Sequence, residues 1–415
     1  MGFANRVQNA SMKPIFLLLF TTRILRMFAY GSLAVILALY LAQLGLSETQ
    51  IGLLLALTLA GDAVISLWLT TNADRIGRRR MLIAGALLML LAGVVFAISR
   101  NWLVLTITAI IGVISPSGNE VGPFLPIEQA ALTQLIPNEK RTHIFAWYNL
   151  AGSFATATGA LACGWLVQFL LGRGFDTLSA YRVIVVGYSL IGIILTVLFL
   201  RMGLQVEVAA DAKISAPANR FGLTKSQAIV ARLSALFALD AFGGAFVLQS
   251  FMAYWFHVRY QVDPGILGSI FFGANVLAGF SALLAARIAK RFGLINTMVY
   301  THIPSNILLI LVPLMPNLPL AIGCLLARFS ISQMDVPTRQ SYTMAVVTPE
   351  ERSAAAGITG IARSVGSSIA PALAGAMLSA GWLSAPFITA GTLKIIYDLA
   401  LYRSFVQVKP PEESM

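Results

Sequence analysis

The sequence predicts an all-α membrane protein with twelve transmembrane helices, arranged as two pseudo-symmetric six-helix bundles. Hydrophobic residues make up 58% of the chain and charged residues only 11%, whereas about a quarter of a soluble domain is charged. Apolar stretches of roughly 20 residues, the length that crosses a bilayer, recur along the whole chain. A single water-soluble core cannot bury so many apolar segments, so we expect lipid to surround most of the protein.

Twelve apolar segments can be placed in order along the 415 residues. The expected spans are residues 15–43, 50–71, 81–99, 103–135, 143–169, 182–200, 226–256, 265–286, 296–315, 319–347, 353–379 and 385–404. The longest polar stretch between them is 201–224. We therefore expect an N-terminal six-helix bundle at 1–200, a cytoplasmic linker at 201–224 and a C-terminal six-helix bundle at 225–415.

The net charge of +12 comes from short loops rather than from a basic stripe that would bind nucleic acid. The loops after every second span carry most of it: Arg75–Arg80, Lys140 and Arg141, Arg201–Lys225, Arg287–Arg291, and Arg352. Basic loops stay in the cytoplasm. We therefore expect a multi-pass protein of a bacterial inner membrane, with both termini cytoplasmic and no nucleic-acid partner.

Two blocks of residues recur in the second half of the chain, which predicts a duplication. Gly52, Arg75 and Gly77 recur 216 positions later as Gly268, Arg291 and Gly293. Pro126, Gln129 and Arg141 recur 211 positions later as Pro337, Gln340 and Arg352. Both offsets are close to half the chain length, so each half supplies one bundle.

The loop between the second and third spans reads Asp74-Arg75-Ile76-Gly77-Arg78-Arg79. It resembles the signature loop of the major facilitator superfamily, roughly Gly-x-x-x-Asp-Arg-x-Gly-Arg-Arg. Three features depart from patterns within that family. Thr70 replaces the leading Gly, the fourth span lacks the Arg of many proton-driven members, and the fifth lacks the Gly-Pro pair of drug antiporters.

The resemblance implies two bundles that rock around a central site and move a small-molecule substrate, in a monomer. It also implies that Asp74 latches the two halves in one state, with Arg75 as its partner. Gly77 permits a tight turn, and Arg78 and Arg79 hold the cytoplasmic face. The alternative is that these basic residues only enforce topology.

Ionisable residues inside a bilayer cost about 2.5–3.5 kcal/mol each on insertion scales, so each needs a reason. In the major facilitator superfamily the first, fourth, seventh and tenth helices line the cavity. Those spans hold the charges here: Arg23 and Arg26; Glu120 and Glu128; Arg232 and Asp240; Arg328, Asp335 and Arg339. Charges three, four or seven residues apart share one helix face.

A carboxylate removed from water tends to take up a proton, and a neighbouring Arg opposes this. The candidates for proton coupling are Asp62, Glu120, Asp240 and Asp335, in that order. The candidates for substrate binding are Arg23, Arg26, Glu128, Arg328, Arg339 and Tyr30. The repeat suggests an ion pair between Glu128 and Arg339, and Lys394 is expected to pair with Asp398. The alternative for the whole set is permanent salt bridges between helices.

We expect a secondary active transporter of a small organic solute, coupled to protons, and we favour export of amphipathic compounds. One alternative is proton-coupled or uniport transport of an organic anion bound by the intramembrane Arg residues. The other is a sensor that does not transport. The chain lacks the Gly-Lys-Ser/Thr phosphate loop, His-Glu-x-x-His and Gly-x-Ser-x-Gly, so we expect no enzyme, cofactor or metal site.

Overall fold

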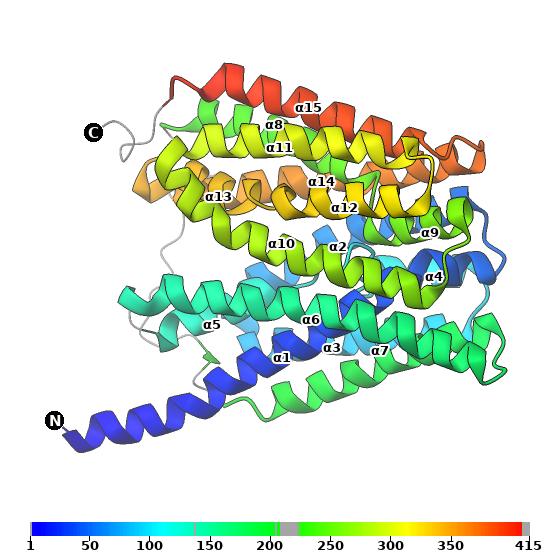
Figure 1. The fold of residues 1–415 in the computed structure, drawn as a ribbon. Helices are drawn as coiled ribbons and strands as arrows, with labels where there is room; N and C mark the ends of the chain where they lie inside the picture. The colour runs from blue at the N-terminus through cyan, green and yellow to red at the C-terminus, as the bar shows by residue number, and fades with distance from the viewer. Residues whose placement is uncertain (1, 137, 204–205, 208–222, 224, 409–415) are drawn as a thin grey trace. The chain divides into compact units, whose positions relative to one another are not determined.

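The computed structural model describes residues 2–136, 138–203, 206–207, 223 and 225–408, and these residues form helices and connecting loops without a strand (Figure 1). Most of the predicted linker, residues 204–205, 208–222 and 224, lies outside the described residues. The first half contains α1 (Gly2–Gln43), α2 (Glu48–Ile76), α3 (Arg78–Ile98), α4 (Trp102–Ile111), α5 (Phe124–Leu135), α6 (Asn138–Gly172) and α7 (Thr177–Leu200).

The second half begins with α8 (Gln227–Ala245). It continues with α9 (Gln249–Tyr260), α10 (Pro264–Phe292), α11 (Leu294–Leu311), the 3₁₀ turn η2 (Val312–Leu314), α12 (Leu318–Ser332), α13 (Asp335–Ala345), the 3₁₀ turn η3 (Pro349–Glu351), α14 (Arg352–Ser379) and α15 (Ala385–Phe405).

Nine helical segments of the described chain are long and apolar enough to cross a membrane. They correspond to nine of the predicted spans, with the seventh made of α8 and α9. The other three predicted spans are also present as helices. The fourth is divided into α4 and α5, the tenth into α12 and α13, and the twelfth is α15, which carries Lys394 and Asp398 in its interior. The chain is therefore an all-α membrane protein.

The predicted continuous helix at 103–135 is interrupted, and the sequence of the break explains why. Gly112 ends α4, and α5 begins only after Pro123. Between them, Gly118 and Gly122 have φ angles of 70° and 80°, which side chains with a Cβ rarely adopt. Proline also removes a backbone donor that a continuous helix needs. The break places Glu120 on a loop rather than on a helix face.

The tenth span is interrupted at the corresponding place. α12 ends at Ser332, and α13 starts two residues after Gln333, at Asp335. Pro337 falls in the first turn of α13, where the backbone N–H has no partner within the helix and its absence is tolerated. The two breaks share the repeat relationship of Pro126 with Pro337. Both occur on spans that carry intramembrane charges.

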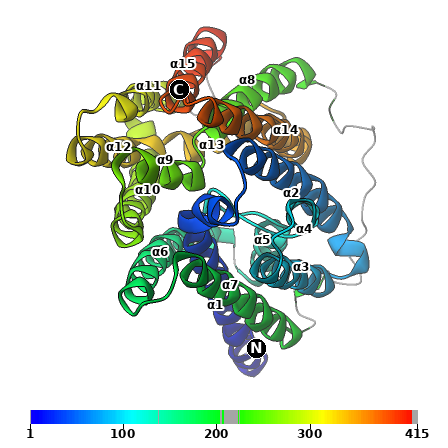
Figure 2. The same cartoon turned by 90° about the vertical axis from the view of Figure 1, so that its right-hand side faces the viewer.

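The described chain divides into two compact units. Unit 1 comprises residues 1–45, 61–213 and 263–272, and unit 2 comprises residues 46–60, 214–262 and 273–415. In unit 1, α1 packs against α6 and α7, and α3 packs against α7 (Figure 1). In unit 2, α8 packs against α14 and α15, and α11 packs against α15 (Figure 2). The boundaries fall inside α2 and inside α10, so each of these helices contributes to both units.

Two glycine pairs repeat the sequence duplication in three dimensions. A Cβ atom on Gly52 would lie 2.8 Å from Cα of Gly375, in unit 2. A Cβ atom on Gly268 would lie 2.9 Å from Cα of Gly164, in unit 1. Only residues without a side chain allow helix backbones this close. The two pairs are related by offsets of 216 and 211 positions, the offsets of the sequence blocks.

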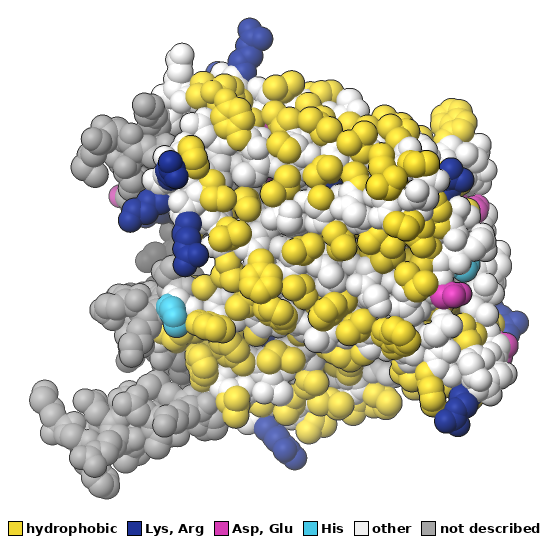
Figure 3. Space-filling model, in the orientation of Figure 1, with side chains coloured by type: hydrophobic (Ala, Val, Ile, Leu, Met, Phe, Trp, Pro, Cys, Tyr) yellow, Lys and Arg dark blue, Asp and Glu magenta, His cyan; other side chains and the backbone are white. Residues whose placement is uncertain are grey.

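The surfaces of the helices are apolar along their middle and charged near their ends. In Figure 3, hydrophobic side chains cover the helices in view, and most Lys and Arg side chains lie toward helix ends. On α7 the exposed set is Val183, Val186, Leu190, Ile193, Ile194, Val197 and Leu200. Such a surface is solvated by lipid.

Candidate functional site

The intramembrane charges form two clusters, and each cluster lies inside one unit. In unit 1, Arg26 of α1 and Glu128 of α5 form a pair with fully buried side chains. Nη1 of Arg26 donates to Oε1 of Glu128 at 2.9 Å, and Nη2 donates to Oε2 at 2.6 Å. The hydroxyls of Thr22 and Tyr148 donate to the same carboxylate. Both carboxylate oxygens of Glu128 are therefore hydrogen-bonded.

Glu120 lies in the loop that interrupts the fourth span, and it bridges two arginines of α1. Its Oε2 accepts a hydrogen bond from Nη1 of Arg23 at 2.8 Å, and its Oε1 accepts one from Nε of Arg26 at 2.7 Å. Arg23 also donates to the backbone carbonyl of Tyr148 at 2.9 Å and to Asn149 at 3.3 Å. Because Arg23 and Arg26 are three residues apart on α1, their side chains reach the same carboxylate.

Asp62 differs from the carboxylates above because it forms no ion pair with a described residue. It is the fifteenth of the 29 residues of α2, near the middle of the span. Its Oδ1 accepts hydrogen bonds from the backbone N–H of Gly122 at 2.8 Å and from the hydroxyl of Ser66 at 3.0 Å. Gly61 makes this contact possible, since a Cβ there would clash with the carbonyl oxygen of Ile110 on α4.

Asp240 of α8 is the centre of the cluster in unit 2. Its Oδ2 accepts a hydrogen bond from Nη1 of Arg339 at 2.8 Å, and its Oδ1 accepts one from Nζ of Lys394 at 2.5 Å. Nη1 of Arg363 lies 3.6 Å from the same Oδ2. Arg339 also pairs with Asp335, four residues earlier on α13, at 3.1 Å. Asp240 and Asp335 are therefore both compensated by cations.

The predicted pair of Lys394 and Asp398 on α15 is not formed, because tertiary partners replace it. Lys394 donates to Asp240, as described above. Asp398 lies 2.8 Å from Nδ1 of His302 and accepts a hydrogen bond from Asn306 at 3.1 Å. Nε2 of His302 is 4.0 Å from Oδ1 of Asp240. The packing of α8, α11 and α15 brings these groups together, which spacing along one helix did not indicate.

The remaining predicted site residues have varied surroundings. Glu128 and Arg339, predicted to pair with each other, instead have the partners described above within their own units. Tyr30 is fully buried, and its hydroxyl donates to the carbonyl of Val121 at 3.3 Å. Arg232 is exposed near the start of α8. Nε of Arg328 is buried without a hydrogen-bond partner among the described residues.

The loop after α2 forms the expected tight turn, with a different partner for its acidic residue. Gly77 has a φ angle of 117°, in the region that favours glycine. Oδ1 of Asp74 accepts a hydrogen bond from Nε of Arg78 at 2.8 Å, and Arg75, the predicted partner, is exposed. Arg79 donates to the carbonyl oxygens of Phe199 and Leu200 at the end of α7.

Glu207, which the sequence reasoning missed, completes this loop. Its carboxylate accepts hydrogen bonds from the backbone N–H groups of Arg78 at 2.7 Å and Arg79 at 3.2 Å. An acidic side chain at a helix N-terminus satisfies free N–H groups and faces the positive end of the helix dipole. The available signal was that Glu207 and Asp211 are the only acidic residues in 201–224.

These features identify the family of the protein. The family model that describes the Major Facilitator Superfamily matches residues 19–334, more than half of the chain. The chain belongs to the Major Facilitator Superfamily. It is a secondary transporter of a small-molecule substrate in a lipid bilayer and not an enzyme.

Known proteins resemble this chain either in sequence or in fold. The uncharacterized membrane protein YJR124C of Saccharomyces cerevisiae is 30% identical over 420 residues, with 94% of each chain covered. The quinolone resistance protein NorA of Staphylococcus aureus is 27% identical over 135 residues, which cover 32% of this chain and 33% of NorA. Among solved structures, the nucleoside transporter NupG is 14% identical, with a TM-score of 0.72 over 94% of this chain and 99% of NupG. The last likeness concerns the fold alone.

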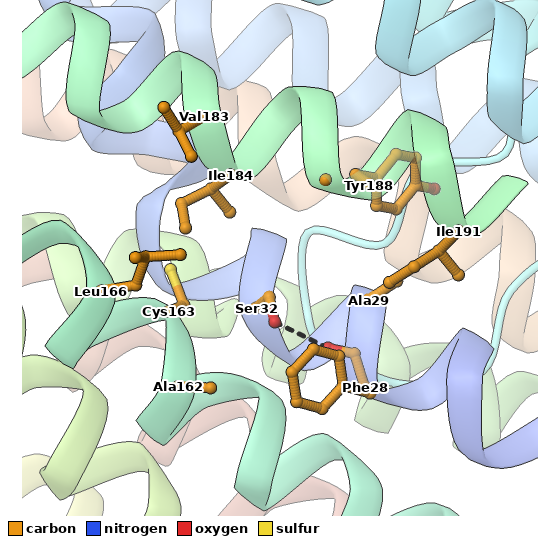
Figure 4. A pocket seen from close by; sticks show the side chains of 11 residues that line it. Phe28, Ala29, Ser32, Ala162, Cys163, Leu166, Val183, Ile184, Tyr188 and Ile191 are labelled. Carbon is orange, nitrogen blue, oxygen red and sulfur yellow. Dashed lines mark hydrogen bonds between the residues drawn. The ribbon is translucent and has the colours of Figure 1, made fainter.

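An apolar pocket of about 120 Å³ lies in unit 1 (Figure 4). Its lining comes from α1, α6 and α7 and includes Phe28, Cys163 and Tyr188. The hydroxyl of Ser32 is turned to backbone carbonyls, that of Phe28 at 2.8 Å and that of Gly159 at 3.0 Å. With its polar groups satisfied, the pocket offers no site for charge recognition.

Proposed function

We propose that the protein is a proton-coupled secondary transporter of a small organic solute, in which Asp62 carries the proton. The supporting observation is the charge balance of the cluster in unit 1. The cluster has two cations, Arg23 and Arg26, which pair with Glu120 and Glu128, and a third carboxylate, Asp62, which has only neutral donors. Uncompensated charge is costly inside a membrane. A proton on Asp62 balances the cluster without disturbing either ion-paired glutamate.

The position of Asp62 allows its protonation to change the conformation of the protein. An ionised carboxylate only accepts hydrogen bonds, whereas the neutral acid also carries an O–H donor. Protonation therefore weakens the contact with the N–H of Gly122, beside the glycines that interrupt the fourth span. The boundary between the units crosses α2 between Ala60 and Gly61, just before Asp62. A proton bound here biases the equilibrium between two arrangements of the bundles.

The proposed arrangement follows the superfamily. Six-helix bundles at 1–200 and 225–415 alternate access to the solute within a monomer, and both termini are cytoplasmic. The basic loops after alternate spans support this orientation. A relative that covers 94% of the chain is a yeast protein, so the proposed orientation does not depend on a bacterial inner membrane.

A second candidate function is export of amphipathic compounds. The observation that favours it is the similarity of about a third of the chain to a protein named for quinolone resistance. Exposed aromatic side chains such as Trp147, which is 55% exposed, are compatible with an aromatic solute. Export and import use the same proton-carrying group, so Asp62 has the same role in both.

Infrared difference spectroscopy of the purified protein tests the assignment without a known solute. We expect the C=O band of a protonated carboxylic acid to change with pH in the wild type and to be lost in Asp62→Asn. Asp263→Asn is the matched control, because Asp263 is exposed in the loop before α10. The band should remain in this control.

Proteoliposomes with a trapped pH dye then test coupling. Separate pools of lipophilic cations, organic anions and neutral solutes are added to the wild type, Asp62→Asn and Asp263→Asn. We expect one pool to drive proton movement in the wild type and the control but not in Asp62→Asn. Solute-driven proton movement that persists in Asp62→Asn would refute the proposed role of Asp62. Solute binding without any flux would favour the sensor alternative.

A further inference from the structure

The cluster in unit 2 holds more positive charge than its carboxylates balance. Its carboxylates are Asp240, Asp335 and Asp398, and its cations are Arg328, Arg339, Arg363 and Lys394. Even with a neutral His302, one cation is in excess. Arg363 lies beside Asp240, and Arg328 belongs to α12 of the same unit.

Two donor atoms without hydrogen-bond partners show which arginines carry the excess positive charge. Arg339 and Lys394 donate directly to Asp240. In contrast, Nη1 of Arg363 and Nε of Arg328 are buried and have no hydrogen-bond partner among the described residues. A buried charged donor without an acceptor is unfavourable. An anion bound beside the exposed part of the Arg363 side chain would offset this unfavourable charge.

Arg363 lies on the inward-facing side of α14, where its neighbours at i−4, i+3 and i+7 are buried. Thr359, Gly366 and Ala370 are buried, and the backbone of Gly366 closely approaches Ala238 of α8. A separate stripe of exposed hydrophobic residues, repeated every four residues, consists of Ile361, Val365, Ile369 and Leu373. Two residues correspond to about 200° around a helix, so Arg363 points away from the start of this stripe.

The face that carries Arg363 has room beside it. Gly360, three residues earlier on the same side of α14, is exposed, and a Cβ placed there would meet nothing within 4 Å. The side chain of Arg363 is itself 36% exposed. An accessible guanidinium with adjoining space, in the middle of an apolar helix, is suited to receive a ligand rather than to hold the fold together.

We propose that Arg363 binds the carboxylate of a monoanionic organic solute. This inference rests on the proposed transport function and names its substrate class. Arg matches a carboxylate geometrically, because its planar fork donates two parallel hydrogen bonds. One bound monoanion balances the excess charge in unit 2, as one proton on Asp62 balances unit 1. The solute and the proton together then carry no net charge across the membrane.

Charge-selective labelling tests the site without a known substrate. Gly360→Cys is introduced into a protein in which Cys163 and Cys324 have been replaced by Ala. The new thiol is then treated separately with two methanethiosulfonate reagents of similar size, one carrying an anionic sulfonate and the other a cationic trimethylammonium group. We expect the ratio of the rate with the anionic reagent to the rate with the cationic reagent to fall about tenfold in Arg363→Gln. A tenfold change is the lower end of the effect that a focused charge has on association rates. Arg363→Lys should keep most of the preference.

The controls separate this proposal from proton coupling. Arg352→Gln removes an exposed arginine at the start of the same helix and should leave the ratio unchanged, as should Asp62→Asn. A ratio that Arg363→Gln does not alter, in protein that elutes as a folded species, would overturn the proposal. So would a thiol, introduced by Gly360→Cys, that reacts with neither reagent.

The ligand class is tested by thermal stabilisation of the purified protein. Benzoate and a series of aliphatic monocarboxylates are each compared with the corresponding neutral amide, and inorganic phosphate forms a separate arm. We expect one or more carboxylates to stabilise the wild type and Arg352→Gln but not Arg363→Gln. Stabilisation by phosphate alone, by amide and acid equally, or by no member of the series would contradict the assignment of an organic carboxylate.

Discussion

The carboxylate of Asp62 accepts a hydrogen bond from the backbone N–H of Gly122 at 2.8 Å, which joins the middle of α2 to the loop that interrupts the fourth span. Gly122 has a positive φ angle, and Gly61 allows α2 to approach the end of α4. The Asp62 side chain therefore holds a loop that contains two glycines with positive φ angles. This relationship is the basis of the first prediction.

Asp62→Ala should release the loop at residues 112–123. The substitution removes the acceptor for the N–H of Gly122, and one hydrogen bond contributes about 1–1.5 kcal/mol. We expect amide hydrogen exchange at Gly122 to accelerate about tenfold, while the interior of α3 is unchanged. Asp62→Asn keeps an acceptor oxygen and should exchange more slowly than Asp62→Ala. Equal exchange in all three proteins would show that the bond does not restrain the loop.

Glu128→Ala should be strongly destabilising, by about 3 kcal/mol or more, because it removes the bidentate partner of the fully buried Arg26. Thermal unfolding in detergent measures the effect. The double variant Arg26→Met with Glu128→Met should recover part of the loss, since no buried charge then remains from this pair. A double variant as unstable as Glu128→Ala would indicate that packing, rather than charge, sets the cost.

Glu207→Ala should destabilise the start of α3 more than Asp74→Ala does. Glu207 accepts hydrogen bonds from two backbone N–H groups, and loss of such a cap costs about 1 kcal/mol. Asp74, whose side chain is 50% exposed, makes one salt bridge with Arg78, which contributes less. Hydrogen exchange at residues 78–81 distinguishes the two. The reverse order would place the stabilising contact at Asp74.

The loop between α6 and α7 should respond to acid. The hydroxyl and backbone N–H of Ser179 hold the pKa of Asp176 below its usual value, since both stabilise the ionised cap of α7. A group whose pKa is lower in the folded state stabilises that state at pH values above its unfolded-state pKa. This stability is lost as the pH falls through the folded-state pKa. We expect the protection of the Ser179 amide to decrease in that acidic range and to be insensitive to pH in Asp176→Asn.

The sequence predicted the membrane class, the positions of the spans and the duplication, because these depend on composition and periodicity. Apolar length decides insertion in a bilayer, and the turn at Gly77 follows from the need for a positive φ angle. The breaks at 112–123 and 333–334 were indicated only by prolines on predicted helices. Proline shows that a helix is disturbed, but tertiary packing decides whether it bends or stops.

The site was predicted as a list of residue types and not as a set of partners. Arg23, Arg26, Glu120 and Asp62 stand out in the sequence because ionisable residues are rare at bilayer depth. Their pairing depends on which helices touch. Lys394 illustrates this, since it bonds to Asp240, 154 positions away, and not to the carboxylate four residues along its own helix.

The sequence by itself determined that this is a twelve-span protein of the bilayer, with charges concentrated on a few helices. Tertiary structure alone decided which charges are compensated. It paired the buried glutamates with arginines of α1, left Asp62 with neutral hydrogen-bond donors, and left Arg328 and Arg363 with unsatisfied donors. The physical reason is that the cost of a buried charge depends on partners a few ångströms away in space, and those partners come from distant parts of the chain.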